Sequence, residues 1–135
     1  WLDLLISVVI QPGLPKEQLT FVYDFPADQA ALARVRPGFP ALAERFELYL
    51  GQIELANGYQ ELTDAIEQRQ RFEAENVRRE HRGQEICKID NHLVTALEHG
   101  LPECAGVALG VDRLLMAICD AKTINEVTAF PYSRA

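Results

Sequence analysis

Apolar and polar residues alternate most regularly between residues 46 and 56, with the period of two that is typical of β-strands. The pattern covers two short runs, residues 46–50 and 53–56, which Gly51 and Gln52 separate. Glycine at the first central position suits a two-residue type II′ turn. The pattern therefore predicts a β-hairpin at about residues 44–56, followed by a loop.

The predicted register places the aliphatic residues of both strands on one face of the hairpin. Glu47 and Glu54 then lie on the other face as diagonal neighbours, roughly 7–8 Å apart at the backbone, with Tyr49 opposite Glu54. Two carboxylates this close repel each other, so the pattern predicts a metal ion or a basic partner. A hydrolase with these two residues as acid and base is disfavoured, because nothing nearby marks either as buried in an apolar pocket.

Three elements are expected before the hairpin. Residues 1–10 are apolar nearly all round, which predicts a buried helix that ends near Pro12. Residues 19–25 are rich in β-branched and aromatic side chains and precede Pro26, which predicts a buried strand. A short helix is expected over residues 27–35.

Charged residues dominate the segment after the hairpin. Asp64 and Glu67 resemble a capping box, which predicts a long helix that ends near Arg82. Its sparse apolar residues favour a solvated surface helix with internal ion pairs, and a nucleic-acid-binding face is the alternative. Asp90 is expected to cap a shorter helix that ends at Gly100.

Small residues alternate with apolar ones in residues 104–116, in a pattern that predicts a strand leading directly into a helix. With Gly106, Ala108 and Gly110 on one face, a flat ligand can lie against the backbone, although a tightly packed sheet centre gives the same pattern. Arg113 falls in the first turn of the helix, where the helix dipole disfavours a cation unless an anion neutralises it. A phosphate group is the natural candidate.

Composition and charge limit the classes of function. The 135 residues are enough for one domain with a core, and 48% hydrophobic and 24% charged residues are typical of globular proteins. A net charge of −7 without a basic stripe argues against gripping a nucleic-acid backbone. No apolar run reaches the length of a membrane span. Because the chain begins at Trp1 without Met, we expect a fragment.

Cysteines and histidines could in principle form a zinc site, but the spacing of these residues along the chain argues against one. Cys87, Cys104 and Cys119 are odd in number and widely spaced, as expected of reduced thiols in the cytoplasm. Together with His92 and His99, they match none of the usual zinc-ligand spacings.

Two stretches together carry a family resemblance: FELYLGQIELANGYQEL (residues 46–62) and GVALGVDRLLM (residues 106–116). In this order they resemble the catalytic core of class II aminoacyl-tRNA synthetases of the lysyl branch, where the second stretch corresponds to motif 3. Within that branch the chain is most similar to the paralogues that modify elongation factor P. The resemblance implies an α+β fold, with an antiparallel sheet flanked by helices. Residues 1–135 would be the C-terminal part of one catalytic domain, without a separate second domain, and motifs 1 and 2 would precede Trp1.

The resemblance also implies a nucleotide site. Glu47 and Glu54 would hold Mg²⁺ at bound ATP. The residues expected to contact ATP are Glu54, Leu55 through its backbone, Gly110 and Arg113. Arg113 would have the catalytic role of stabilising the polyphosphate.

The amino-acid pocket is implied in the same way. Glu61 would bind the ammonium group of the substrate, and Asn57 and Gly58 would line the pocket. Ala108 stands where lysyl-tRNA synthetases usually have Gly. One added methyl group at this position can change the preference between α- and β-lysine by about 1 kcal/mol.

The implied function is ATP-dependent activation of (R)-β-lysine, or lysine, as an acyl-adenylate, followed by transfer to a lysine side chain of elongation factor P. The enzyme would be a cytoplasmic homodimer that uses neither tRNA nor a membrane. One alternative is the catalytic core of a lysyl-tRNA synthetase, in which a tRNA hydroxyl is the acceptor. Another is a truncated, non-catalytic paralogue that serves as a binding module, but retention of all three glutamates and Arg113 argues against it.

Overall fold

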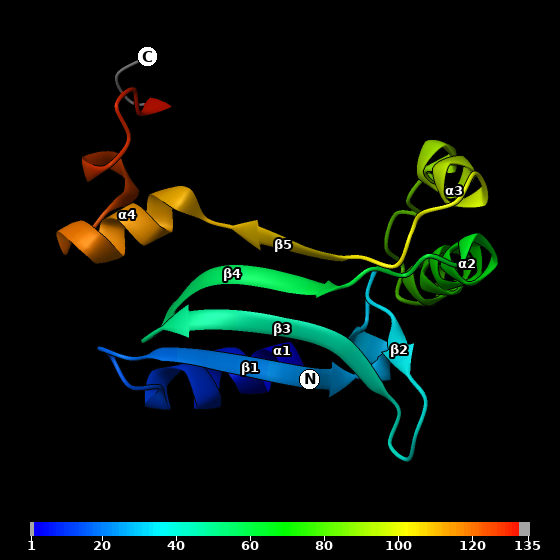
Figure 1. Ribbon diagram of the computed structural model, residues 1–135, viewed down its shortest axis with the longest axis horizontal. Helices are drawn as coiled ribbons and strands as arrows, with labels where there is room; N and C mark the ends of the chain where they lie inside the picture. Colours follow the sequence, from blue (N-terminus) through cyan, green and yellow to red (C-terminus); the bar gives the residue numbers. More distant parts are fainter. Residues whose placement is uncertain (1, 133–135) are drawn as a thin grey trace. The chain divides into compact units, whose positions relative to one another are not determined.

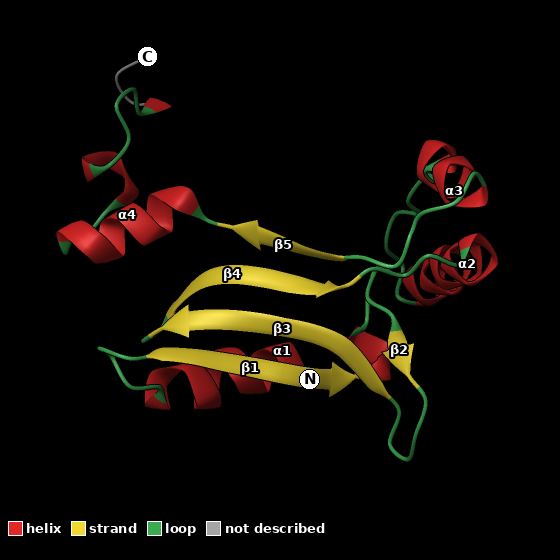
Figure 2. Ribbon diagram, viewed as in Figure 1, coloured by secondary structure: helices red, strands yellow, loops and turns green. Residues whose placement is uncertain are grey.

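The computed structural model describes residues 2–132. Five strands form one antiparallel sheet in the order β1-β3-β4-β5, with the short β2 paired to β3 (Figure 1). The strands are β1 (Leu19–Pro26), β2 (Val35–Arg36), β3 (Leu42–Leu50), β4 (Ile53–Gln60) and β5 (Ala105–Leu109). The α-helices are α1 (Leu2–Leu5), α2 (Ala65–His81), α3 (Asn91–Glu98) and α4 (Val111–Cys119). This α+β arrangement confirms the predicted fold class (Figure 2).

The chain divides into two compact units. Within the described residues, unit 1 contains residues 2–23, 46–58 and 107–132, and unit 2 contains residues 24–45 and 59–106. Within the described residues, no helix is both long and apolar enough to cross a membrane.

In unit 1 the predicted hairpin is confirmed. Gly51, at the first central position of the turn, has a positive φ of +54°. Gln52, at the second position, does not have a positive φ. This combination is the pattern of a type II′ turn. A Cβ at Gly51 would also lie 3.3 Å from the backbone of Lys16, so glycine is required twice at this position. The loop predicted after residue 56 is wrong, because β4 continues to Gln60. β5 pairs with β4 and supplies the partner that keeps this segment extended.

The N-terminal segment of unit 1 is helical as predicted, but it is not buried. α1 continues as a π-helix over Ile6–Ile10 and a 3₁₀ turn over Gln11–Gly13. Ile6 is buried, whereas Val8 and Val9 are each 62% exposed. A helix against one sheet face buries only the side that contacts it, so an apolar pattern all round does not suffice for burial.

The strand predicted before the hairpin is confirmed as β1, but its burial is not. Phe25 is the buried residue of this strand, and Phe21 is 57% exposed although its ring lies 5.6 Å from that of Phe46. β1 has β3 as its sheet neighbour and stands at one end of the strand order. A strand in that position lacks the second neighbour that would help to cover it.

In unit 2 the helix predicted over residues 27–35 is reduced to a 3₁₀ turn at Ala27–Gln29. The backbone after it is drawn into the sheet instead, because Arg34 N donates to Gln60 O at 2.8 Å and Leu62 N donates to Leu32 O at 3.0 Å. These long-range hydrogen bonds override the local helix propensity of an alanine-rich segment.

Both predicted helices of unit 2 begin where their caps were expected. Asp64 Oδ1 accepts from the backbone N–H groups of Ile66 and Glu67 at 2.8 and 3.0 Å, and Asp90 caps α3 in the same way. α2 is largely exposed and carries two ion pairs along its own surface, Arg71 with Glu67 and Arg78 with Glu75. The prediction of a surface helix with internal ion pairs is therefore confirmed.

We expect Asp64→Ala to lower the free energy of unfolding by about 1 kcal/mol, because the first turn of α2 loses its side-chain acceptor. Urea denaturation of the full-length protein checks this value. Glu73→Ala is the matched control, since it removes an exposed carboxylate from the middle of the same helix. Equal destabilisation by both variants would contradict the capping role.

Candidate active site

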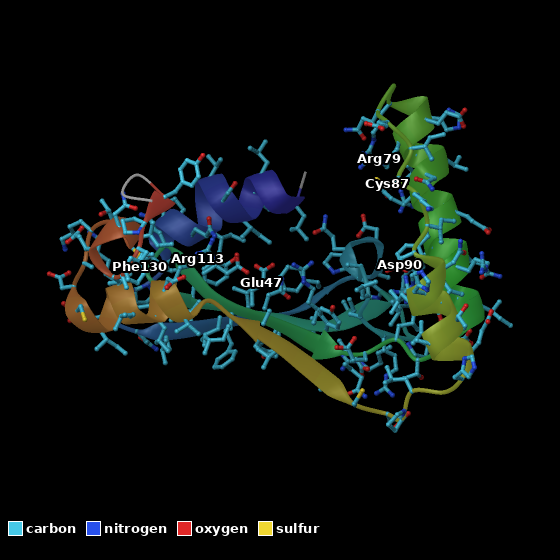
Figure 3. All side chains as sticks on the ribbon, turned by 90° about the horizontal axis from the view of Figure 1, so that it is seen from above. Glu47, Arg79, Cys87, Asp90, Arg113 and Phe130 are labelled. Atoms are coloured by element: carbon cyan, nitrogen blue, oxygen red, sulfur yellow. The ribbon has the colours of Figure 1, made fainter. Side chains whose placement is uncertain are left out.

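Glu47 is a carboxylate on the more buried face of the hairpin in unit 1. It is 8% exposed, and Tyr49, two residues further along β3, is 2% exposed. The Tyr49 hydroxyl donates a hydrogen bond to Glu47 Oε2. Figure 3 shows Glu47 on the side of the sheet where the N-terminal helical segment lies. A buried carboxylate needs such donors, because desolvation without them costs several kcal/mol.

The charge of Glu54 also reaches Tyr49. Burial raises the pKa of the Tyr49 phenol, and the hydrogen bond to Glu47 and the negative charge of Glu47 raise it further. The charge of Glu54 acts in the same direction, whereas a hydrogen bond with Gln11 lowers the pKa. Both carboxylates therefore raise the pKa of the same phenol, as expected if Glu47 and Glu54 lie on one face of the hairpin.

Arg113 supplies a basic partner for Glu54. Its Nη1 donates to the backbone oxygen of Glu54 at 2.9 Å and lies 3.8 Å from Glu54 Oε2. The side chains are 55% and 35% exposed, so this ion pair contributes at most about 1 kcal/mol. The repulsion expected between the two carboxylates is thus partly relieved by the protein itself. A guanidinium in so weak a pair remains suited to bind a stronger anion.

The start of α4 is joined to β4 by one backbone hydrogen bond. Gly110, the N-cap residue of α4, donates from its backbone N to Leu55 O at 2.8 Å. Four residues predicted at the nucleotide are therefore brought together in unit 1, namely Glu54, Leu55, Gly110 and Arg113. The backbone carbonyl of Leu55 therefore already accepts a hydrogen bond within the protein, from Gly110 N.

Glu61 belongs to unit 2 and follows the end of β4. Its backbone N donates to Cys104 O at 3.0 Å. Its carboxylate lies against the backbone of Gly106, where an ideal Cβ would overlap Oε1 and would be 3.5 Å from Cδ. Burial raises the pKa of Tyr59, and the charge of Glu61 raises it further. The sequence pattern placed Gly106 on a small-residue face that could receive a flat ligand, but it did not predict that Gly106 lies beside Glu61.

Three further residues were predicted at the amino-acid pocket, and all belong to unit 1. Gly58 is buried and Asn57 is half-buried, both on β4, whereas Ala108 is exposed on β5. Their predicted contacts with a substrate stay predictions.

The carboxylates of unit 1 fit a magnesium ion that is shared with a phosphate ligand. Within residues 2–132 no group of three or more His, Cys, Asp or Glu side chains is arranged to hold a metal. Mg²⁺ is commonly bound by one or two carboxylates, with substrate phosphates and water as its other ligands. Glu47 and Glu54 supply two hard oxygen donors of this kind on one face, so the donor set is chemically suitable for Mg²⁺ at a nucleotide.

Residues 7–134 match the family model of the class II tRNA synthetases (D, K and N). The chain belongs to this family. Class II membership agrees with the antiparallel sheet and with the strand–helix junction at β5 and α4.

Curated relatives of this class II chain include proteins named elongation factor P–(R)-β-lysine ligase. Those of Vibrio cholerae serotype O1 and Klebsiella pneumoniae are each 53% identical to it over 99% of the chain. The protein of that name from Salmonella arizonae is 52% identical over the same share. The chain spans 41% of the length of each of these relatives.

We expect Tyr49→Phe to lower the free energy of unfolding by about 1–3 kcal/mol, because it removes a buried donor from the Glu47 carboxylate. Urea denaturation near neutral pH of the full-length protein measures the effect. Tyr23→Phe is the matched control, since Tyr23 is 69% exposed. A loss no larger than that of the control would contradict a structural role for the hydroxyl.

The same pair predicts the alkaline behaviour. The pKa of Tyr49 is higher in the folded protein than in the unfolded chain, so folding favours the neutral phenol. This preference stabilises the folded protein fully at pH values below the ordinary tyrosine pKa. The stabilisation is lost as the pH rises above the ordinary tyrosine pKa. We therefore expect Tyr49→Phe to destabilise the protein less at alkaline pH than near neutral pH.

Proposed function

We propose that this chain is part of a ligase that activates (R)-β-lysine with ATP and transfers it to a lysine side chain of elongation factor P. The observation that carries the proposal is 53% identity over 99% of the chain to proteins named for that reaction. The clustering of Glu54, Leu55, Gly110 and Arg113 supports a nucleotide site of the class II type. Free cysteines at positions 87, 104 and 119 suit a reducing compartment, so we propose a cytoplasmic enzyme.

The residues of unit 1 would act at the nucleotide. Glu47 and Glu54 would remain ionised as ligands of Mg²⁺, which supplies positive charge against the phosphate oxygens when it is bound. Leu55, through its backbone, and Gly110 would contact the nucleotide, and Arg113 would exchange its weak contact with Glu54 for the polyphosphate. The guanidinium would then offset the charge that develops during the reaction.

The amino acid would be activated by attack of its carboxylate on the α-phosphorus of ATP. A new P–O bond forms, the bond to the β-phosphate breaks, and pyrophosphate leaves. An amine of the acceptor then attacks the acyl carbon, and AMP leaves. Glu61 would hold the ammonium group of the substrate, with Asn57, Gly58 and Ala108 lining the pocket.

A lysyl-tRNA synthetase core is the second candidate, because the matched family model includes the lysyl enzymes. We expect Ala108 to distinguish the two candidates, since the resemblance places it at a position where lysyl-tRNA synthetases usually have Gly. A methyl group in the pocket favours a differently shaped substrate by about 1 kcal/mol.

We expect the full-length protein to exchange labelled pyrophosphate into ATP faster with (R)-β-lysine than with α-lysine, and to transfer the acyl group to elongation factor P. Ala108→Gly should shift the preference toward α-lysine by roughly 5- to 10-fold in kcat/KM. Preference of the unaltered protein for α-lysine, together with charging of tRNA, would favour the synthetase. Absence of exchange with either amino acid would favour a non-catalytic binding module.

The metal assignment predicts that Glu54→Gln weakens binding of Mg²⁺–ATP by about 10-fold or more, because a neutral amide is a poor Mg²⁺ ligand. Isothermal titration calorimetry of the full-length protein with ATP, at several Mg²⁺ concentrations, measures this directly. Glu73→Gln, an equal change on the exposed side of α2, should leave the affinity unchanged. Equal affinities for all three proteins would remove Glu54 from the metal site.

A further inference from the structure

Gly106 lies on β5 in unit 2, where the carboxylate of Glu61 occupies the space that a side chain would fill. An ideal Cβ at this position overlaps Glu61 Oε1 and lies 3.5 Å from Glu61 Cδ. The hydrogen bond from Glu61 N to Cys104 O, at 3.0 Å, fixes the backbone of Glu61 beside the strand. The close approach therefore follows from the pairing of β4 with β5.

The backbone of Gly106 does not itself require glycine. Its φ is outside the positive region, unlike that of Gly83 at +66° or Gly100 at +101°. Gly13 and Gly110 lack such a neighbour: a Cβ at Gly13 meets nothing within 4 Å, and one at Gly110 would make an ordinary contact of 3.4 Å with Arg113. At Gly106, the reason for glycine is the room that Glu61 takes.

We propose that Gly106 is a positioning residue that sets where the Glu61 carboxylate meets the ammonium group of the substrate. This inference rests on the proposed role of Glu61. The atom that a methyl group would displace is the end of a flexible side chain, so the fold accommodates the methyl group by moving the carboxylate. A charge-assisted hydrogen bond depends on distance and direction, and a displacement of about 1 Å can cost up to 100-fold in rate.

The surroundings of Glu61 make its position matter. Tyr59 is half-buried on β4. Burial raises the pKa of its phenol and the negative charge of Glu61 raises it further, whereas the charge of Arg45 lowers it. Glu61 is itself half-buried. Electrostatic interactions are stronger in such a place than in open water, so a displaced carboxylate loses more than it would on an open surface.

The test is a double-mutant cycle in the full-length protein with Gly106→Ala, Glu61→Gln and the double variant, measured by pyrophosphate exchange with (R)-β-lysine and with α-lysine. We expect Gly106→Ala to raise the KM for the amino acid by about 10-fold, with the KM for ATP changed less than about 2-fold and the melting temperature unchanged. In the Glu61→Gln background, Gly106→Ala should have little further effect, because both changes act on one carboxylate. Gly13→Ala, which adds a methyl group in open space, is the matched control.

The possible results distinguish the positioning role of Gly106 from the proposed role of Glu61 as the ammonium ligand. Additive effects of Gly106→Ala and Glu61→Gln, or an unchanged KM in Gly106→Ala, would overturn the positioning role while leaving Glu61 as the ammonium ligand. An equal rise in the KM for ATP would overturn it as well, since a general disturbance of the sheet would then explain the loss. If Glu61→Gln leaves the KM for the amino acid unchanged, or no exchange occurs, both the inference and the proposed role of Glu61 fail.

Discussion

The pairing of β5 with β4 is the constraint on which the candidate site depends. In unit 1 it joins Gly110 N to Leu55 O and so brings the first turn of α4 to the hairpin. In unit 2 it joins Glu61 N to Cys104 O and so lays the Glu61 carboxylate against Gly106. Residues about 50 positions apart in the chain become neighbours through these backbone hydrogen bonds.

Within unit 1, the protein stabilises its acidic residues by different means. Glu47 is buried and accepts a hydrogen bond from an equally buried tyrosine, whereas the more exposed Glu54 lies near Arg113. The first arrangement is costly to disturb, because a buried carboxylate that loses a donor bears its desolvation penalty. The second is weak and exposed, so it can be exchanged for another partner at little cost. One glutamate is thus fixed by the fold, while the other and its arginine remain adaptable.

The nucleotide site proposed for unit 1 would account for the presence of both kinds of partner. Binding of a nucleotide polyphosphate requires preorganised positive charge, together with carboxylates that stay ionised as metal ligands. A guanidinium held by a weak carboxylate contact keeps its charge in place until a stronger anion binds. The structure of unit 1 therefore suits anion binding.

The amino-acid sequence by itself determined the local features of this protein. Alternation over residues 46–56 and the Gly51-Gln52 turn specify the hairpin, because period and turn chemistry act over a few residues. Asp64 and Asp90 specify the starts of α2 and α3 for the same reason, since a cap satisfies backbone groups of its own helix. The residues proposed for the nucleotide site were predicted from two motifs, whereas the distances between them come from the folded structure.

Long-range packing decided the remaining features. The alanine-rich segment after β1 enters the sheet rather than forming a helix, since hydrogen bonds to Gln60 and Leu62 outweigh its propensity. The apolar residues of the N-terminal helix are largely exposed, because burial depends on what packs against a residue and not on its polarity. The need for glycine at position 106 likewise arises from Glu61, a neighbour that only the folded chain brings into contact with it.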